Sequence, residues 1–212
     1  MDEVERGLRI AELNEELSEA KRLTPISLAA RIEELGFSCL RCGECCRGED
    51  NSVLVFPREV RRICAAAGLA WLEVAGPPED GEWGRDGSFH TLEWRLKKDG
   101  ESCRFYQEGR CSIYMDRPLL CRTYPFYLDR GELMHSECRG LGRRIDPGEA
   151  EKIAKVLISR QITEIEEAIS LMEIYQDFDR GDPEERRGKG GITVHDSEGE
   201  HRIVGGELRI SE

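Results

Sequence analysis

The chain of 212 residues is long enough for one compact domain with a hydrophobic core. Hydrophobic residues make up 39% and charged residues 35%, as in a polar globular protein, and the net charge of −12 argues against nucleic acid or an anionic membrane as main partner. No apolar leader opens the sequence and no apolar run is long enough for a membrane span, so we expect a cytoplasmic protein with reduced thiols.

Residues 1–36 predict two helices. In the first, apolar residues recur at intervals of three and four, as on one face of a helix: Ile10, Leu13, Leu17 and Ala20. Thr24 before Pro25 is typical of a helix start and Gly36 of a helix end, so the second helix is expected over Pro25–Leu35.

The middle of the chain predicts short elements separated by turns. In chain order they are a strand over Ser52–Phe56, a helix over Pro57–Ala67 that ends at Gly68, an irregular stretch over Ala75–Gly87, a strand over Ser88–Lys97, further extended pieces up to Leu128 and a hairpin turn over Asp129–Leu133. We expect a core with little regular structure here.

A long helix is predicted after Asp146 and Pro147, and it runs to about Tyr175. Its apolar stripe alternates steps of four and three and indicates a packing face: Ile158, Ile162, Ile165, Ile169 and Met172. Residues 181–212 are rich in Gly and charged residues, so we expect a flexible tail with at most a small hairpin.

The cysteines carry the strongest functional signal. Cys39, Cys42 and Cys45 are each separated by two residues, which is how a ferredoxin-type ligand run begins. Cys46 follows directly, and four more lie downstream: Cys103, Cys111, Cys121 and Cys138. Such density in a reducing compartment indicates metal binding by eight cysteines. Cys64 stands alone in an apolar helix and is expected to be a core residue.

The adjacent thiols of Cys45 and Cys46 are expected to point in different directions, because neighbouring side chains diverge on a helix and on a strand. We therefore expect them to serve two different irons or two sites, with one thiol facing the downstream cysteines. Eight thiolates are enough for two four-cysteine centres, or for one centre and a redox-active remainder.

Arginines and aromatic residues surround these cysteines. An arginine lies within one residue of a cysteine at six positions: Arg41, Arg47, Arg104, Arg110, Arg122 and Arg139. We expect their N–H groups to donate to sulfur. Aromatic side chains concentrated between Phe105 and Tyr127 are expected to shield the centre from water.

Together, "CLRCGECC", "CRFYQEGRCSIYMDRPLLCRTYPF" and "CRGLG" resemble the CxxCxxCC cysteine-cluster family, the YkgJ-like zinc- or iron-chelating domains. The resemblance covers about Phe37 to Gly142. It implies that the metal ligands are Cys39, Cys42, Cys45, Cys46, Cys103, Cys111, Cys121 and Cys138, and it includes Arg117, Pro118 and Arg122. Arg139 stands where many relatives have proline. Some larger relatives are flagellin lysine methylases, but this chain is too short to assume their activity.

We expect an α+β fold: a small, irregular, cysteine-rich and metal-centred core with short strands, flanked by N-terminal and C-terminal helices. The expected segments are N-terminal helices over 1–36, the cysteine-cluster domain over 37–142, a long helix over 146–180 and a flexible tail over 181–212. Metal binding and folding should be coupled, because the loops have little else to order them.

The leading functional hypothesis is an iron-sulfur protein, with a 4Fe-4S cluster, in electron transfer or in cluster-dependent modification of another protein. The alternative is a zinc-stabilised protein-binding module or a metal chaperone without catalytic activity. The partner would be another protein rather than nucleic acid or a membrane. Of the histidines only His135 is a candidate substitute ligand, and no residue identifies a substrate or a catalytic group.

Overall fold

The computed structural model describes residues 3–48, 51–182, 187 and 189–210. The chain forms two compact units, each built from two segments, where one domain was expected. Unit 1 combines Met1–Asn51 with Phe105–Glu166, and unit 2 combines Ser52–Arg104 with Glu167–Glu212. The two units are defined by tertiary packing, whereas the four predicted segments were defined by sequence motifs. The division into those four segments stays a prediction.

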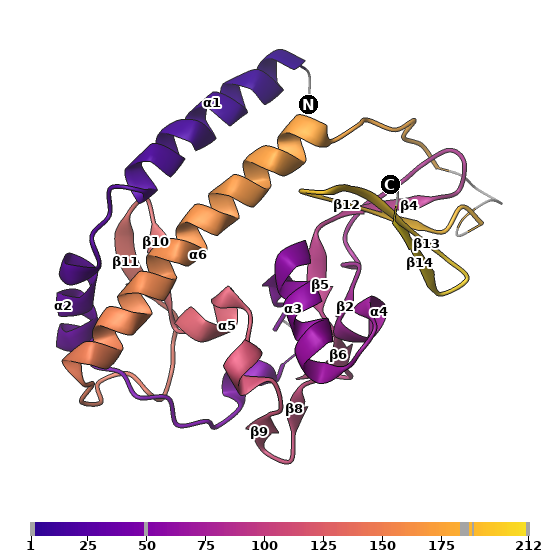
Figure 1. The fold of residues 1–212 in the computed structure, drawn as a ribbon. Helices are drawn as coiled ribbons and strands as arrows, with labels where there is room; N and C mark the ends of the chain where they lie inside the picture. Colours follow the sequence, from indigo (N-terminus) through magenta and orange to yellow (C-terminus); the bar gives the residue numbers. More distant parts are fainter. Residues whose placement is uncertain (1–2, 49–50, 183–186, 188, 211–212) are drawn as a thin grey trace. The chain divides into compact units, whose positions relative to one another are not determined.

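The helices confirm the α+β class and several predicted boundaries (Figure 1). The α-helices of the described residues are α1 (Glu3–Ala20), α2 (Pro25–Leu35), α3 (Pro57–Ala67), α4 (Trp71–Val74), α5 (Leu119–Thr123) and α6 (Pro147–Ile174). Both α2 and α3 begin at a proline and end before a glycine with positive φ, as their sequences indicate. The side chain of Asp146 accepts the amide hydrogens of Gly148 and Glu149 and so caps α6.

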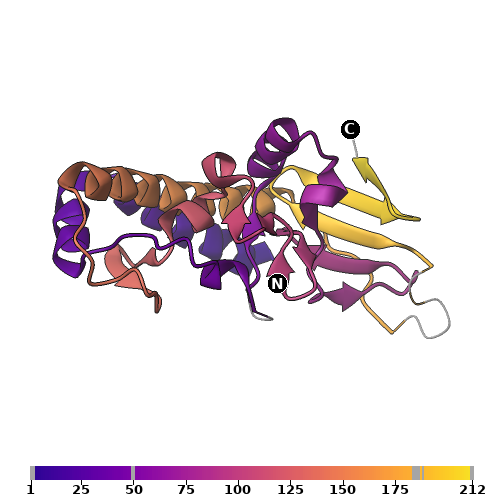
Figure 2. The same cartoon turned by 90° about the horizontal axis from the view of Figure 1, so that it is seen from below.

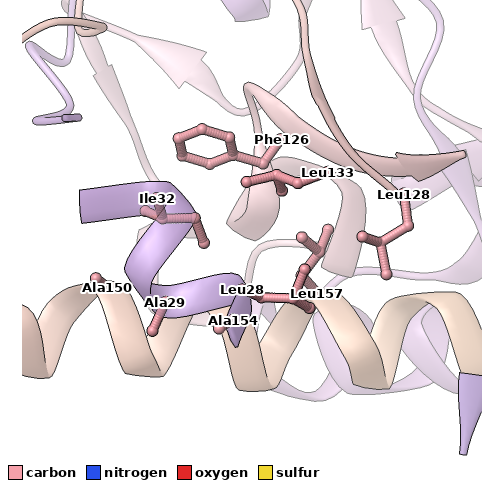
Figure 3. Packing of buried hydrophobic residues seen from close by; sticks show 9 residues of the cluster. All are labelled: Leu28, Ala29, Ile32, Phe126, Leu128, Leu133, Ala150, Ala154 and Leu157. Atoms are coloured by element: carbon pink, nitrogen blue, oxygen red, sulfur yellow. The ribbon is translucent and has the colours of Figure 1, made fainter. Parts of the chain in front are cut away.

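Unit 1 has an apolar core that involves no cysteine. Figure 3 shows α2 lying against α6, with side chains of the hairpin β10 (Phe126–Asp129) and β11 (Glu132–His135) beside them. The buried residues are Leu28, Ala29, Ile32, Phe126, Leu128, Leu133, Ala150, Ala154 and Leu157. The first buried turns of α6 are therefore lined by alanine and leucine, earlier along the helix than the predicted isoleucine stripe. Of that stripe, Ile165 and Ile169 are buried.

The remaining small elements of unit 1 carry the cysteines. They are η1 (Glu44–Cys46), β8 (Tyr106–Gln107), β9 (Arg110–Cys111) and η2 (Tyr114–Asp116). β8 and β9 form a two-stranded hairpin, and η1 and η2 are single turns of 3-10 helix. The apolar core is formed by other residues, and the expected coupling of metal binding to folding of the cysteine loops stays a prediction.

Unit 2 is organised by two sheets. β1 (Leu54–Val55), β5 (Trp94–Leu96) and β2 (Ala75–Gly76) form an antiparallel sheet in the order β1-β5-β2. The second sheet, part of which is seen in Figure 2, has the order β14-β13-β12-β4-β3. Its strands are β3 (Glu82–Trp83), β4 (Phe89–Leu92), β12 (Ile192–Asp196), β13 (Gly199–Val204) and β14 (Glu207–Ile210). A further pair joins β6 (Lys98–Asp99) to β7 (Ser102–Cys103).

Two expectations differ from this architecture. Residues 192–210 form three strands where a flexible tail was expected, because β12 pairs in parallel with β4, a partner far away in the sequence. Residues 183–186, 188 and 211–212 of that predicted tail lie outside the described residues. The single strand expected over Ser88–Lys97 is interrupted at Glu93, whose φ is 60°, so that its two halves enter different sheets.

In the described part of the chain, no helix combines the length and the apolar character that a membrane crossing requires.

Candidate metal centre

The first cysteine loop leaves α2 at Gly36 and has no regular structure until η1 (Figure 1). Two residues in the loop have positive φ, Arg41 at 52° and Gly43 at 75°. A Cβ on Gly43 would lie 2.1 Å from Cζ of the Tyr106 ring, so only glycine fits between this ring and the backbone. The Tyr106 hydroxyl also donates a 3.3 Å hydrogen bond to the carbonyl of Cys42, which places β8 directly against the loop.

Cys45 and Cys46 face each other, contrary to the expectation that they diverge. Their Sγ atoms are 3.9 Å apart, because the 3-10 turn of η1 brings the two side chains together. Two thiolates on one tetrahedral zinc would be about 3.8 Å apart, since each Zn–S bond is about 2.3 Å long. The contact with Cys46, followed by burial, raises the pKa of the Cys45 thiol. The pair therefore has the spacing of two ligands of one ion.

Cys138 is held against the same loop by backbone contacts. The amide of Ser38 donates a 3.0 Å hydrogen bond to the carbonyl of Gly140, and Phe37 forms an antiparallel bridge with Leu141. Arg139, at the position where many relatives have proline, places its guanidinium 2.8 Å from the Glu44 carboxylate. The segment after β11 therefore brings Cys138 to the loop that carries Cys39, Cys42 and Cys45.

Electrostatic effects agree with this arrangement. Burial raises the pKa of the Cys138 thiol, and the nearby thiols of Cys42, Cys39 and Cys45 raise it further, while the amide of Gly140 donates to its sulfur and opposes the shift. Burial also raises the pKa of Tyr124, with Cys138, Cys45 and Cys42 as additional causes. These four cysteines thus lie in one neighbourhood of unit 1.

Cys111 and Cys121 belong to elements that pack in the same unit. Cys111 pairs with Tyr106 across the β8–β9 hairpin, and burial raises the pKa of its thiol, with the charge of Cys45 as a smaller cause. Cys121 lies on α5. The hydroxyl of Thr123 on the same short helix accepts a 3.0 Å hydrogen bond from Arg160 of α6, which fixes α5 against the long helix.

The other two cysteines belong to unit 2. Cys103 lies on β7 and pairs with Lys98 of β6. Cys64 lies on α3, half-buried, where burial raises the pKa of its thiol. Cys64 is thus only partly a core residue, and the structure does not group it with other thiols.

The arginines near the cysteines contact rings and carbonyls. The guanidinium of Arg117 lies 3.6 Å and that of Arg41 4.7 Å from the centre of the Tyr114 ring, and Arg47 donates to the carbonyl of Cys42 across 3.1 Å. The expected hydrogen bonds from arginine to sulfur stay a prediction. Cation–π contacts of this kind connect the first cysteine loop to η2.

Cysteine thiolates are ligands for both zinc and iron, so the donor set of unit 1 fits either metal. Seven of the eight predicted ligands are in this unit: Cys39, Cys42, Cys45, Cys46, Cys111, Cys121 and Cys138. Among the described residues, no group of three or more His, Cys, Asp or Glu side chains is close enough to hold one ion.

Residues 38–139 match the family model named CxxCxxCC, whose description is "Putative zinc- or iron-chelating domain". The cysteine-bearing segment belongs to the CxxCxxCC family. Metal binding by zinc or iron chelation is therefore the function of this CxxCxxCC domain. No solved structure matches the chain.

From the sequence alone, Gly43 and Gly140 have no assigned role in the CxxCxxCC domain, and Tyr124 is only one of the aromatic residues expected to shield the centre. Gly43 and Gly140 allow the closest approaches to Tyr106 and to Ser38, and Tyr124 anchors the downstream loop through a 2.7 Å hydrogen bond to the carbonyl of Glu137. Glycines and tyrosines are common beside loops, so only the tertiary contacts distinguish these three.

Proposed function

We propose that the CxxCxxCC domain holds an iron-sulfur cluster, with Cys39, Cys42, Cys45 and Cys138 as ligands. The observation that supports this set is the attachment of the Cys138 segment to the cysteine loop through Ser38 and Gly140. Three cysteines at intervals of three and a distant fourth are the ligand pattern of ferredoxin-type centres. A [4Fe-4S] cluster is the form that four such thiolates would bind.

Such a cluster would supply a one-electron carrier, for electron transfer or for cluster-dependent modification of another protein. The surrounding residues would tune it. The amide of Gly140 lies 3.4 Å from the sulfur of Cys138, and N–H groups that donate to sulfur raise the potential of a cluster. The proposed partner is a protein, since the net charge of −12 disfavours nucleic acid and anionic membranes.

The remaining cysteines of unit 1 would form a second group of thiols. Cys46, Cys111 and Cys121 are not needed for the first set. In this proposal they hold a second centre. All nine cysteines are free thiols, and the proposal places the protein in the cytoplasm, where thiols stay reduced.

A zinc site is the second candidate, and the Cys45–Cys46 pair favours it. Their sulfur separation of 3.9 Å matches two corners of a tetrahedral zinc site, whereas cysteines on a cubane cluster bind separate irons and are farther apart. With zinc, the protein would be a metal-stabilised binding module or a metal chaperone, without electron transfer.

The deciding experiment is anaerobic purification followed by iron, sulfide and zinc analysis and an absorption spectrum. For the iron-sulfur function we expect a brown protein with iron and sulfide in equal amounts. Cys138→Ser should lose the iron and sulfide of this first cluster, while Cys64→Ser, the same substitution at a cysteine outside the proposed ligands, should keep them.

A colourless protein with zinc and no sulfide would replace the iron-sulfur function by the zinc function. If Cys138→Ser kept the full metal content, the proposed ligand set would be wrong with either metal. Cys46→Ser separates the two candidates further, because it should remove metal from a zinc site that uses both adjacent thiols and leave a cluster on the first set in place.

A further inference from the structure

Three of the four histidines are buried in unit 2, and two of them, His90 and His195, contact each other although they are far apart in the sequence. His90 is on β4, His195 on β12 and His201 on β13, and all three side chains are buried. Nδ1 of His90 lies 2.9 Å from Nε2 of His195, so a direct hydrogen bond joins the two neighbouring parallel strands. The ring of Phe178 stacks on His90 at 3.6 Å, and Tyr175 packs beside His195.

The hydrogen bonds assign the protons of this pair. The hydroxyl of Ser88 lies 2.5 Å from a carboxylate oxygen of Asp86, and this bond lowers the pKa of Asp86, so the carboxylate is ionised and can only accept. Ser88 therefore donates its single hydrogen to Asp86. Its oxygen is 2.7 Å from Nε2 of His90, which must then donate to it.

The assignment continues to the second ring. Because Nε2 of a neutral His90 carries the hydrogen, its Nδ1 is an acceptor, and Nε2 of His195 must donate to it. Both rings are thus Nε2–H tautomers. Nδ1 of His195 is left with a lone pair and has no hydrogen-bond partner among the described residues, although Oε1 of Glu200 is 3.6 Å away.

This arrangement has room for one added proton. A proton on Nδ1 of His195 would face the Glu200 carboxylate and form an ion pair. A second proton would have to go to Nδ1 of His90, where it would meet the N–H of His195 across 2.9 Å. Two donors that face each other at this distance repel, so the doubly protonated pair is incompatible with the observed contact.

The charged groups around the two rings do not offset the repulsion in the doubly protonated pair. Burial is the main cause that lowers the pKa of His90 and of His195. Asp86 and Glu200 favour the charged form of His90, and Arg202 and the second ring oppose it. For His195, Asp196 favours the charged form, and Arg180 and His201 oppose it.

We propose that the His90–His195 pair is a proton-sensitive latch between β4 and β12, closed when both rings are neutral and opened by double protonation. Since the folded state binds protons less readily than the unfolded state, the latch stabilises unit 2 fully above pH of about 6.5 and loses this contribution as the pH falls below that value. The proposal concerns unit 2 alone and is independent of the metal centre.

The test is urea unfolding of the full chain between pH 7 and pH 5, followed by tryptophan fluorescence. All three tryptophans, Trp71, Trp83 and Trp94, are in unit 2, so the signal reports this unit. While the folded pair binds no proton and the unfolded rings bind two, the unfolding constant should rise by up to about 100-fold per pH unit, and by about tenfold once the folded pair holds the one proton that it can accept. His195→Gln, whose amide can still donate to His90, should reduce this to about tenfold.

His135→Gln is the matched control, because His135 is exposed in unit 1, and it should unfold with the wild-type pH dependence. Nitrogen-15 NMR of the wild-type imidazoles tests the proton assignment without any substitution, and both rings should be Nε2–H tautomers at pH 8. An Nδ1–H tautomer on either ring, or equal pH dependence in wild type and His195→Gln, would overturn the latch.

Discussion

The amide of Ser38 donates a 3.0 Å hydrogen bond to the carbonyl of Gly140, and this bond joins the start of the cysteine loop to the segment that carries Cys138. The approach is close enough that a Cβ on Gly140 would lie 2.6 Å from the carbonyl oxygen of Ser38 and 2.9 Å from the Phe37 ring. A backbone atom cannot move aside as a flexible side chain can.

Gly140→Ala should therefore push the Cys138 segment away from the loop and lower both the metal content and the free energy of unfolding. We expect a loss of about 1–3 kcal/mol, as for overpacked sites, measured by denaturant unfolding with metal analysis of the same samples. Gly7→Ala is the control, because nothing lies within 4 Å of that position on α1 and alanine is the better helix former. Equal metal content in both variants would contradict the role of Gly140.

A second prediction concerns the contact between Gly43 and Tyr106. Gly43→Ala should reduce metal content, since the new Cβ would overlap the Tyr106 ring and the φ of 75° disfavours alanine. Adding Tyr106→Ala removes the overlap and should restore part of the metal content. The backbone strain would remain, at about 1 kcal/mol, so full recovery in the double variant would show that the ring alone matters.

Arg160 should position Cys121. Its guanidinium donates to the Thr123 hydroxyl at 3.0 Å and pairs with Glu164 at 2.6 Å. Arg160→Met keeps an unbranched apolar stem but removes the guanidinium donors, so α5 should lose its attachment to α6. We expect reduced protection of the α5 amides in hydrogen exchange, with the apolar core unchanged. Thr123→Val, which removes the acceptor, should give the same local effect.

Metal binding should weaken steeply on acidification. Burial raises the pKa of Cys111 and of Cys138, so these thiols keep their protons at neutral pH until a metal displaces them. Each thiol that must lose a proton makes the affinity fall by about tenfold per pH unit as the pH decreases. Competition with a chromophoric chelator between pH 8 and pH 6 measures this slope. An affinity independent of pH would exclude these thiols as ligands.

The apolar core of unit 1 predicts a large effect for Leu157→Ala. Leu157 is 1% exposed between α2 and the β10–β11 hairpin, so its truncation should cost about 2–5 kcal/mol of unfolding free energy. Met115→Ala, at a position 84% exposed in the same unit, should change stability by less than about 0.5 kcal/mol. Circular dichroism in urea measures both. Similar values for the two variants would mean that this core contributes little.

Helix boundaries were predicted correctly where one residue type fixes the backbone conformation. Pro25 and Pro57 start helices and Gly36 and Gly68 follow their ends, as predicted, because proline and glycine impose these conformations by themselves. The hairpin around Arg130 and Gly131 was predicted for the same reason.

The pairing of strands that are far apart in the chain could not be predicted from local residue types. The pairing of Ile192–Asp196 with Phe89–Leu92 depends on a partner strand far away in the chain, and the preceding glycines and charges suggested a tail. The contact between His90 and His195 follows from the same pairing. A single sequence does not show which distant strands become neighbours in a sheet.

The cysteine spacing predicted the kind of site but not its local geometry. The family followed from the order of the cysteines and the family model confirmed it, and its description supports metal binding by zinc or iron. The expectation that Cys45 and Cys46 diverge assumed a regular helix or strand, whereas η1 is a single 3-10 turn that brings their sulfurs to 3.9 Å.

The family segment and the folding unit have different limits, which matters for the choice of a fragment to study. The family model covers residues 38–139, but most of the apolar core of unit 1 comes from outside that range: Leu28, Ala29, Ile32, Ala150, Ala154 and Leu157. The family model thus matches the cysteine-bearing loops, while most of the apolar core of unit 1 comes from helices on either side of them. A fragment cut at the family limits would keep every cysteine and lose α2 and α6, which form most of the apolar core of unit 1.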